Sequence, residues 1–507
     1  MKRSQREAMN IVSIVTIVAM CTLFAVAMYL RVRNISSFVR TKSTSTIFAL
    51  SSGSVRSALA TIRVSGPHAA AVLRRIANLK QPTPRKALLR KLVHPCSGVH
   101  LDSAIVLWFP SPHSYTGEDC CELHVHGGPG VVNAVLGALS HIEDVRQAEP
   151  GEFTKRAFLN GKMDLAEVEG LADLLRAETE AQRIQALAQM EGSLSKLYMQ
   201  WTHDLKMCLA NVEAFIDFSE DQGIEEAILD SAAAQAEKLA TEIQAHLSDG
   251  RRGERLRGGV KVAIIGRTNV GKSSLFNALC QRDAAIVSPI AGTTRDVVES
   301  MLDIGGYPAV FSDTAGLRNS DDPVEQEGIS RAQRWAAGAD LALIVVDAKE
   351  FLHLQPTTDF TEDYLKQLGL MSCAPLRLIV FNKRDLLSAD EQVAVEKKAK
   401  RLPVESCFTS CTTLQGIADL VKILSARLEA LCGKPAECSP LLTQERHRRN
   451  LEQCLKHLKL FSTEVQSDSV IGAEHLRIAI THIGKITGRV FTEEILDVIF
   501  RDFCIGK

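Results

Sequence analysis

The sequence predicts a multidomain protein with an α+β domain, a helical domain and a doubly wound α/β domain inserted into the helical one. At 507 residues the chain is too long for a single hydrophobic core. Apolar residues three to four positions apart, typical of helices, occur both before and after a segment in which strands and helices alternate. The parts that we predict, in chain order, are an extension, the α+β domain, the first helical part, the α/β domain and the second helical part, with the boundaries 1–45, 46–163, 164–258, 259–432 and 433–507.

The composition limits the classes of protein that fit. A net charge of −1 gives no overall basic field for nucleic acid, so any RNA contact must come from local patches. The stretch 74–91 holds seven basic residues and no acid, and we expect it to be solvated surface. Thirteen cysteines without a CxxC pair or zinc spacing favour a reduced intracellular compartment.

The extension has two features that conflict. Met9–Leu30 is uncharged and apolar enough to span a bilayer, whereas Arg31–Ser45 is basic and serine-rich like a transit peptide. We expect a targeting extension. A membrane anchor and a misassigned start codon are the alternatives.

The α+β domain is predicted from short apolar strands parted by turn residues. Its strands are expected at Thr46–Leu50, Ala58–Val64, Ala104–Phe109 and Cys121–Val125, with a helix over Val131–Leu139.

The helical domain is predicted from an apolar stripe that should form a bundle core. The stripe consists of Ile184, Leu187, Met190, Leu194, Leu197, Trp201, Leu205, Cys208, Val212 and Phe215. A polar, glycine-rich linker is expected over Arg251–Gly259, and helices are expected to resume at Leu441.

Apolar strands expected at Val260–Ile265, Leu341–Val346 and Leu376–Phe381 define the α/β domain. Four motifs follow its strands and loops in order: Gly266–Ser273 with the pattern GxxxxGKS, Gly292-Thr293-Thr294, Asp313-Thr314-Ala315-Gly316 and Asn382-Lys383-Arg384-Asp385. Together they predict a guanine nucleotide, a magnesium ion and phosphoryl transfer to water.

Each motif has a physical role. Backbone N–H groups of the glycine-rich turn surround the phosphates, while Lys272 reaches the β and γ oxygens and the Ser273 hydroxyl binds Mg²⁺. Thr294 is placed to complete the Mg²⁺ site, Asp313 approaches the ion through water, and the Gly316 N–H can contact the γ-phosphate.

The last motif selects guanine, because the Asp385 carboxylate can accept the N1–H and N2–H that adenine does not present together. The backbone at Ser410-Cys411 is expected to contact guanine O6. The full predicted GTP set is Asn269, Val270, Gly271, Lys272, Ser273, Ser274, Thr293, Thr294, Asp313, Thr314, Ala315, Gly316, Asn382, Lys383, Asp385, Ser410 and Cys411.

Hydrolysis needs a device other than the usual glutamine, because Leu317 stands where Ras-type enzymes place it. Two residues can replace it. Glu325 could orient water, and Asn269 could hold a monovalent cation against the phosphates. Ordinary loop polarity is the alternative explanation for both.

These motifs, with others along the chain, closely resemble the MnmE/TrmE family of tRNA-modification GTPases, in particular its mitochondrial members. The resemblance spans Thr46 to Lys507. The further matching segments are Ser114–Asp119, His126–Pro129, Pro150–Thr154, Arg156–Lys162 and Cys504–Lys507.

The resemblance implies a Ras-like GTPase domain inserted into a helical domain, and an N-terminal domain that dimerises and binds 5,10-methylene- or 5-formyl-tetrahydrofolate. The folate residues that it implies are Arg63, Glu122, Lys162 and Lys507. It further implies a K⁺ ion held by Asn269, Ser288, Ile290 and Thr293. It also implies catalytic importance for Cys504, whose alternative role is a small apolar filler.

In this family a partner subunit carries FAD, and the pair modifies carbon 5 of the wobble uridine of tRNA. In mitochondria, in the matrix, the expected product is 5-taurinomethyluridine, with glycine as the alternative amine donor to taurine. Two other classes stay open: an RNA- or ribosome-assembly GTPase, and a membrane-remodelling GTPase suggested only by Met9–Leu30.

Overall fold

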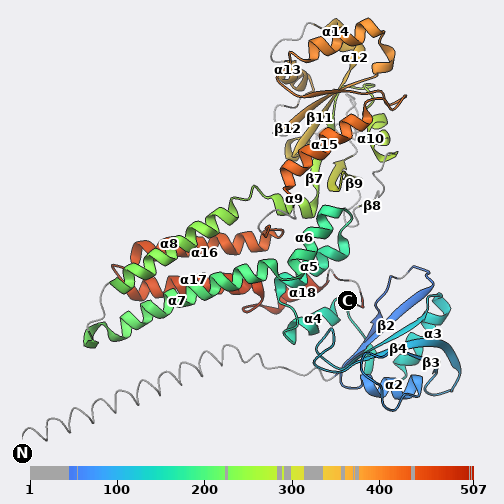
Figure 1. The fold of residues 1–507 in the computed structure, drawn as a ribbon, viewed down its shortest axis with the longest axis vertical. Coiled ribbons are helices and arrows are strands. Elements are labelled where there is room, and N and C mark those ends of the chain that lie inside the picture. The colour runs from blue at the N-terminus through green and yellow to red at the C-terminus, as the bar shows by residue number, and fades with distance from the viewer. Residues whose placement is uncertain are drawn as a thin grey trace, which may run out of the picture. The chain divides into compact units, whose positions relative to one another are not determined.

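The structure is a computed structural model that describes residues 45–53, 55–222, 227–281, 288–289, 299–312, 335–354, 360–368, 370, 376–434, 440–501, 503 and 505–506. These residues form two compact units, one up to Met163 together with those from Leu496 onward, and the other from Asp164 to Ile495 (Figure 1). The apolar run Met9–Leu30 lies outside the described residues. Within the described ranges, no helix combines the length and apolarity needed to cross a membrane.

The first unit is built on a six-stranded sheet of order β3-β4-β5-β2-β1-β6, in which only the pair β1–β6 is parallel. Its elements are β1 Thr46–Leu50, β2 Leu59–Ser65, α2 Ala69–Ala77, β3 Leu88–Val93, β4 His100–Phe109, β5 Cys120–His126, α3 Pro129–Ser140, β6 Val145–Gln147, α4 Glu152–Leu159 and the end of α18 Glu493–Arg501. The basic stretch 74–91 therefore runs from the end of α2 into β3.

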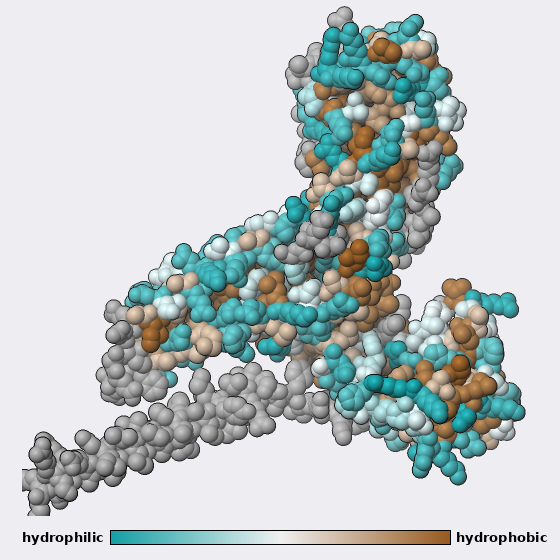
Figure 2. Space-filling model, viewed as in Figure 1, coloured by the Kyte–Doolittle hydropathy of each residue, from teal (hydrophilic) through white to brown (hydrophobic). Residues whose placement is uncertain are grey.

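The two faces of this sheet differ. Alternate residues such as Ile62 and Leu123 form a core with α2 and α3. The opposite face carries polar residues beside three exposed apolar ones, Leu59, Leu89 and Ile105. Figure 2 shows hydrophobic residues among hydrophilic ones on the visible surface of this unit.

The second unit contains a helical bundle made from two separate chain segments. Its helices are α5 Leu165–Arg176, α6 Glu180–Met190, α7 Ser193–Gln222, α8 Ala227–Leu247, α16 Glu445–Glu464 and α17 Ser469–Thr487. Helix α7 packs against α8 and α17, while α16 packs against α8 and α17 (Figure 1). Tyr198, Trp201 and Phe461 are among the large side chains of the shared core.

The predicted stripe is correct along α7 but wrong along α6. Leu194, Trp201 and Leu205 are buried as expected. On α6, however, the buried side chains are small or polar, namely Ala181, Gln182, Gln185, Ala186 and Gln189, while Ile184, Leu187 and Met190 are only half-buried. The reason is that Ala181 packs into the core of the α/β domain, and the Gln189 amide bonds the Ala166 carbonyl and the Thr443 hydroxyl.

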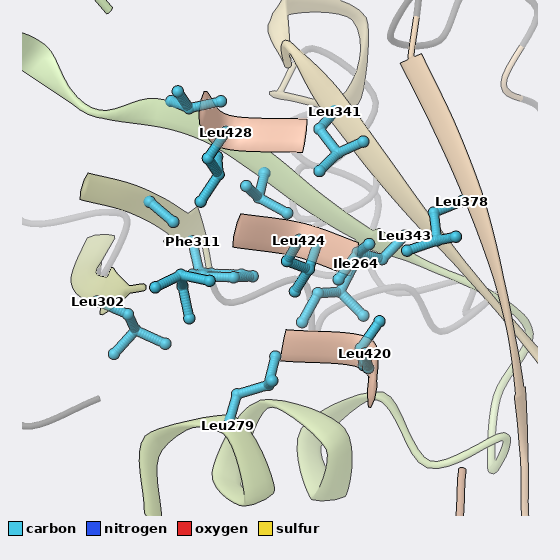
Figure 3. Packing of buried hydrophobic residues seen from close by; sticks show 14 of the residues in the cluster. Ile264, Leu279, Leu302, Phe311, Leu341, Leu343, Leu378, Leu420, Leu424 and Leu428 are labelled. Atoms are coloured by element: carbon cyan, nitrogen blue, oxygen red, sulfur yellow. The ribbon is translucent and has the colours of Figure 1, made fainter. Parts of the chain in front are cut away.

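The α/β domain has a sheet of order β13-β12-β11-β7-β10-β9-β8, in which the strands from β13 to β10 are parallel and β9 pairs antiparallel with both β10 and β8. Its elements are α9 Arg252–Gly258, β7 Val260–Ile265, α10 Lys272–Gln281, β8 Ser288–Pro289, β9 Glu299–Ile304, β10 Tyr307–Ser312, β11 Leu341–Asp347, α12 Ala348–His353, α13 Phe360–Gln367, β12 Leu376–Asn382, the 3-10 turn η1 Arg384–Leu386, α14 Ala389–Ala399, β13 Ser406–Phe408 and α15 Ile417–Cys432. Leu420, Leu424 and Leu428 of α15 pack on the sheet beside Ile264 and Phe311 (Figure 3).

The sequence predicts a polar, glycine-rich linker over Arg251–Gly259, but most of this segment is helical. It forms α9, because Leu256 is fully buried in the α/β core. Ion pairs from Arg255 to Asp340 and from Arg257 to Asp173, at 2.8 and 2.7 Å, hold its polar side. The architecture agrees with the predicted fold class: an α+β domain, a helical domain made from two chain segments, and a mainly parallel α/β domain between those segments.

Candidate functional site

The loop that is predicted to bind the phosphates connects β7 to α10. Its backbone needs glycine at two places: a side chain at Gly266 would approach the Val345 carbonyl oxygen to 2.5 Å, and one at Gly271 would approach the Asn382 amide nitrogen to 2.2 Å. Asn269, at the tip, has a φ of 60° and is exposed. Such left-handed positions favour residues like asparagine.

Lys272, at the start of α10, is oriented by two hydrogen bonds to the loop before it. Its Nζ donates to the carbonyl oxygens of Gly266 at 2.9 Å and Arg267 at 2.8 Å, and partial burial lowers its pKa. Ser273 and Ser274, in the same first turn, are exposed. The N-terminus of a helix with free N–H groups and a cation suits the phosphates of a nucleotide.

Asn382 connects the predicted phosphate loop to the loop that contains Cys411. Its side-chain nitrogen donates to the Val270 carbonyl at 2.9 Å. Its side-chain oxygen accepts the Cys411 N–H at 3.3 Å and lies 3.2 Å from the Cys411 thiol. The carboxylate of Asp385, three residues on, is exposed and available to a base.

The neighbours of Asn382 fix the loop around it. Lys383 has a φ of 63°, and its ammonium pairs with Asp347 at 2.9 Å, which lowers the pKa of that carboxyl against the opposing effect of burial. Ser410 is buried, and its hydroxyl accepts the Thr413 N–H at 3.1 Å. The backbone at Ser410-Cys411 is predicted to contact guanine O6, and in the structure the Cys411 N–H of this pair donates to Asn382. Burial raises the Cys411 pKa to about 11, so the thiol stays protonated at neutral pH.

Several predicted site residues lie outside the described part of the chain. They are Ile290, Thr293, Thr294, Asp313, Thr314, Ala315, Gly316, Glu325, Cys504 and Lys507. Ser288 is placed in β8 by its backbone alone. The roles given to these residues therefore stay predictions.

A second polar site occupies the open face of the N-terminal sheet. Arg63 on β2 lies opposite Glu122 on β5, and both Nε and Nη2 of Arg63 are 3.0 Å from one oxygen of that carboxylate. The other carboxylate oxygen is 3.3 Å from the His124 ring. The Arg63 guanidinium also lies 4.7 Å from the centre of the Tyr115 ring.

One atom of this site lacks a partner. Arg63 Nη1 is buried and makes no hydrogen bond to any residue that the structure describes. Because leaving such a cationic donor unpaired is unfavourable, the site suits a ligand that brings an acceptor. Tyr115 and Phe153, which flank the guanidinium, were not predicted, although Tyr115 stands within the segment Ser114–Asp119 noted above.

Lys162 and the C-terminal tail belong to the same unit. The Lys162 ammonium donates to the Pro112 carbonyl at 3.2 Å. In the tail, Ile505 forms a β-bridge with Pro150, and the Gly506 carbonyl accepts the Ser51 hydroxyl at 2.8 Å. Gly506 has a φ of 101°, and a side chain there would overlap the Leu50 carbonyl. This packing places the last described residues against the strand-end loop that follows β1.

The chain was compared with known proteins. Residues 165–504 match the family described as MnmE helical domain, and residues 46–162 match GTP-binding protein TrmE N-terminus. The protein belongs to the MnmE/TrmE family. The relatives include the mitochondrial 5-taurinomethyluridine tRNA synthase subunit of Danio rerio, 51% identical, with 91% of this chain and 93% of that one covered. The corresponding Homo sapiens subunit is 47% identical over 92% and 94%.

The bacterial tRNA modification GTPase MnmE of Parvibaculum lavamentivorans is 46% identical, with 91% of this chain and all of that one covered. The predicted family is thus confirmed. As an MnmE/TrmE protein, the chain is a tRNA modification GTPase, and two loops that we predict to bind GTP meet at the Asn382 side chain.

Proposed function

We propose that this protein is a mitochondrial GTPase that takes part in forming 5-taurinomethyluridine at the wobble position of tRNA. The observation that carries the proposal is 47–51% identity, over about nine tenths of the chain, to subunits named for that synthesis. The GTP site supports it, because the phosphate loop, Lys272 and Asn382 are already arranged around one another.

GTP binds with its phosphates at the loop and its base at Asp385. Mg²⁺ is held by the hydroxyls of Ser273 and Thr294; Ser273 fits this role because it is exposed at the first turn of α10. The ion neutralises charge on the phosphates when bound. Lys272 orients the β- and γ-phosphates. Glu325 orients the attacking water, the role of the glutamine that Ras-type enzymes have at the position of Leu317.

K⁺ is the proposed activator. The exposed amide oxygen of Asn269 suits it as a ligand, and Ser288, Ile290 and Thr293 complete the proposed set. A monovalent cation there supplies positive charge beside the phosphates. Exchange of K⁺ for Na⁺ tests this assignment.

Tetrahydrofolate is the proposed ligand of the N-terminal site. The unpartnered Arg63 Nη1 and the Glu122 carboxylate fit a pterin, which offers both acceptors and N–H donors. Lys162, and Lys507 at the end of the tail, complete the proposed contacts. Cys504 is proposed to act beside them. A folate bound there would supply the one-carbon unit.

The protein is proposed to work as a homodimer with an FAD-dependent, MnmG-like subunit on tRNA. The exposed Leu59, Leu89 and Ile105 on the open sheet face support dimerisation through the N-terminal domain. The word subunit in the names of the relatives supports a second component.

Mass spectrometry of mitochondrial tRNA nucleosides tests the function. Cells that lack the protein should lose 5-taurinomethyluridine from wobble positions, and re-expression of the intact chain should restore it. Unaltered wobble uridines together with defective ribosome assembly would favour an RNA-assembly switch instead.

A further inference from the structure

The backbone of Arg267, the residue after Gly266, is hydrogen-bonded to Tyr364. This tyrosine belongs to none of the nucleotide motifs. Tyr364 lies on α13 and is only 3% exposed. Its hydroxyl donates to the Val345 carbonyl at 3.1 Å and accepts the Arg267 N–H at 3.2 Å. Burial raises the pKa of Tyr364, so the hydroxyl keeps the proton that it donates. One oxygen atom thus connects strand β11 to the phosphate loop.

The peptide between Gly266 and Arg267 is consequently fixed on both edges. In a trans peptide the C=O and N–H groups point in opposite directions. The Gly266 C=O accepts from the Lys272 ammonium at 2.9 Å, and the N–H of the same peptide is bonded to Tyr364. Rotation of this peptide would break both contacts.

The Arg267 side chain strengthens the arrangement from outside the nucleotide site. Its guanidinium pairs with Glu350 of α12 and Gln367 of α13. Its central carbon lies 5.4 Å from the centre of the Tyr364 ring. This side chain therefore holds the tyrosine in place and is directed toward α12 and α13.

We propose that Tyr364 is a positioning residue for GTP, acting through Lys272. An ammonium group has three N–H donors. Two of them are directed to the Gly266 and Arg267 carbonyls, which leaves the third for a phosphate oxygen. By fixing the peptide that carries the first of these carbonyls, Tyr364 sets the direction of that third donor.

The substitution Tyr364→Phe tests the proposal, because it removes the hydroxyl and keeps the ring. Titrations of the full-length protein should show GTP and GDP affinity reduced about tenfold, the order of effect of unpairing one buried N–H. GMP affinity should be unchanged, since GMP lacks the phosphates that Lys272 reaches. In a Lys272→Ala background, Tyr364→Phe should cause no further loss of GTP affinity.

The matched control is Tyr198→Phe. It removes another buried hydroxyl, in the helical bundle, that bonds no described residue. It should leave the affinity for all three nucleotides unchanged. A loss for GMP equal to that for GTP, or a further loss in the Lys272→Ala background, would overturn the proposal and make Tyr364 a support of the fold alone.

A second variant keeps the test decisive if Tyr364→Phe lowers the melting temperature strongly. Arg267→Ala keeps the hydroxyl and removes the group that lies over the ring. It should give a smaller loss of GTP affinity, again with GMP unchanged. If Arg267→Ala weakens GMP as much as GTP, positioning through Lys272 is excluded.

Discussion

The Asn382 side chain connects two loops of the predicted GTP site. The sequence predicts that this asparagine belongs to the base-binding motif. In the structure, the Asn382 amide bonds both the Val270 carbonyl and the Cys411 N–H, which connects the two loops predicted to bind the phosphates and the base. These partners are 112 and 29 positions away in the chain.

The proposed cation site at Asn269 makes hydrolysis depend on the salt. GTP turnover should be at least roughly tenfold faster in K⁺ than in Na⁺, because a fitted cation stabilises charge on the phosphates in the transition state. Phosphate release measured in the two chlorides checks this. Asn269→Ala should remove the difference; equal wild-type rates in both salts would exclude the cation mechanism.

The proposed role of Glu325 separates binding from catalysis. Glu325→Ala should bind GTP normally but hydrolyse it about a hundredfold more slowly, because the water is no longer oriented. Glu327→Ala, two positions along the same segment, is the matched control and should turn over normally. Undiminished hydrolysis by Glu325→Ala would mean that another group orients the water.

Arg63 is expected to dominate folate affinity. Arg63→Ala should weaken tetrahydrofolate binding by roughly tenfold or more, the order of effect of a charge-assisted hydrogen bond. Calorimetric titration measures it. Arg75→Ala, an exposed arginine on α2 over the other face of the sheet, should leave the affinity unchanged. Unchanged folate affinity in Arg63→Ala would move the pocket elsewhere.

At the scale of single elements, periodicity predicts long helices well and connecting helices poorly. Helix α7 packs only against other helices of the bundle among the residues that the structure describes. Its buried face is therefore a continuous apolar stripe. Helix α6 serves two domains at once and therefore buries alanines and glutamines. Helix α9 is short, and Leu256 is its main buried residue. Its composition is otherwise polar, and for that reason the sequence predicts a linker there.

The junction between α5 and α16 predicts an acid-sensitive contribution to stability. Glu169 is buried and accepts hydrogen bonds from Nε and Nη2 of Arg446, each at 3.0 Å, and lies 2.6 Å from the His447 ring nitrogen. Burial alone would raise its pKa, but His447 and Arg446 lower it to about 2. The stabilisation is therefore complete above the ordinary pKa of 4.5 and is lost as the pH falls toward 2.

Denaturant unfolding of wild type and Glu169→Gln measures this contribution. The wild type should be more stable by about 3 kcal/mol at pH 7, and the difference should shrink as the pH falls below about 4.5. Glu445→Gln, which removes one carboxylate from an exposed pair with Arg449, should change stability by less than about 0.5 kcal/mol. A difference that is constant with pH would contradict the assignment.

For the whole molecule, the fold class could be predicted because helical and mixed segments differ in their hydrophobic period, and the GTPase activity because its motifs are short and local. The roles of the single GTP-site residues stay predictions. The N-terminal site was accessible only by resemblance. Arg63 and Glu122 are 59 positions apart and meet through strand pairing that no local pattern announces. No local pattern predicts the contact of Tyr364 either, because its partner Arg267 lies 97 positions away in the chain.

The central claim is that the GTP site and the proposed folate site serve one modification. Mass spectrometry of mitochondrial tRNA from cells that express only Lys272→Ala or only Arg63→Ala tests it most directly. Both variants should lose 5-taurinomethyluridine, although purified Lys272→Ala should still bind tetrahydrofolate and purified Arg63→Ala should still bind GTP. Normal wobble modification in cells that express only one of these variants would contradict the account.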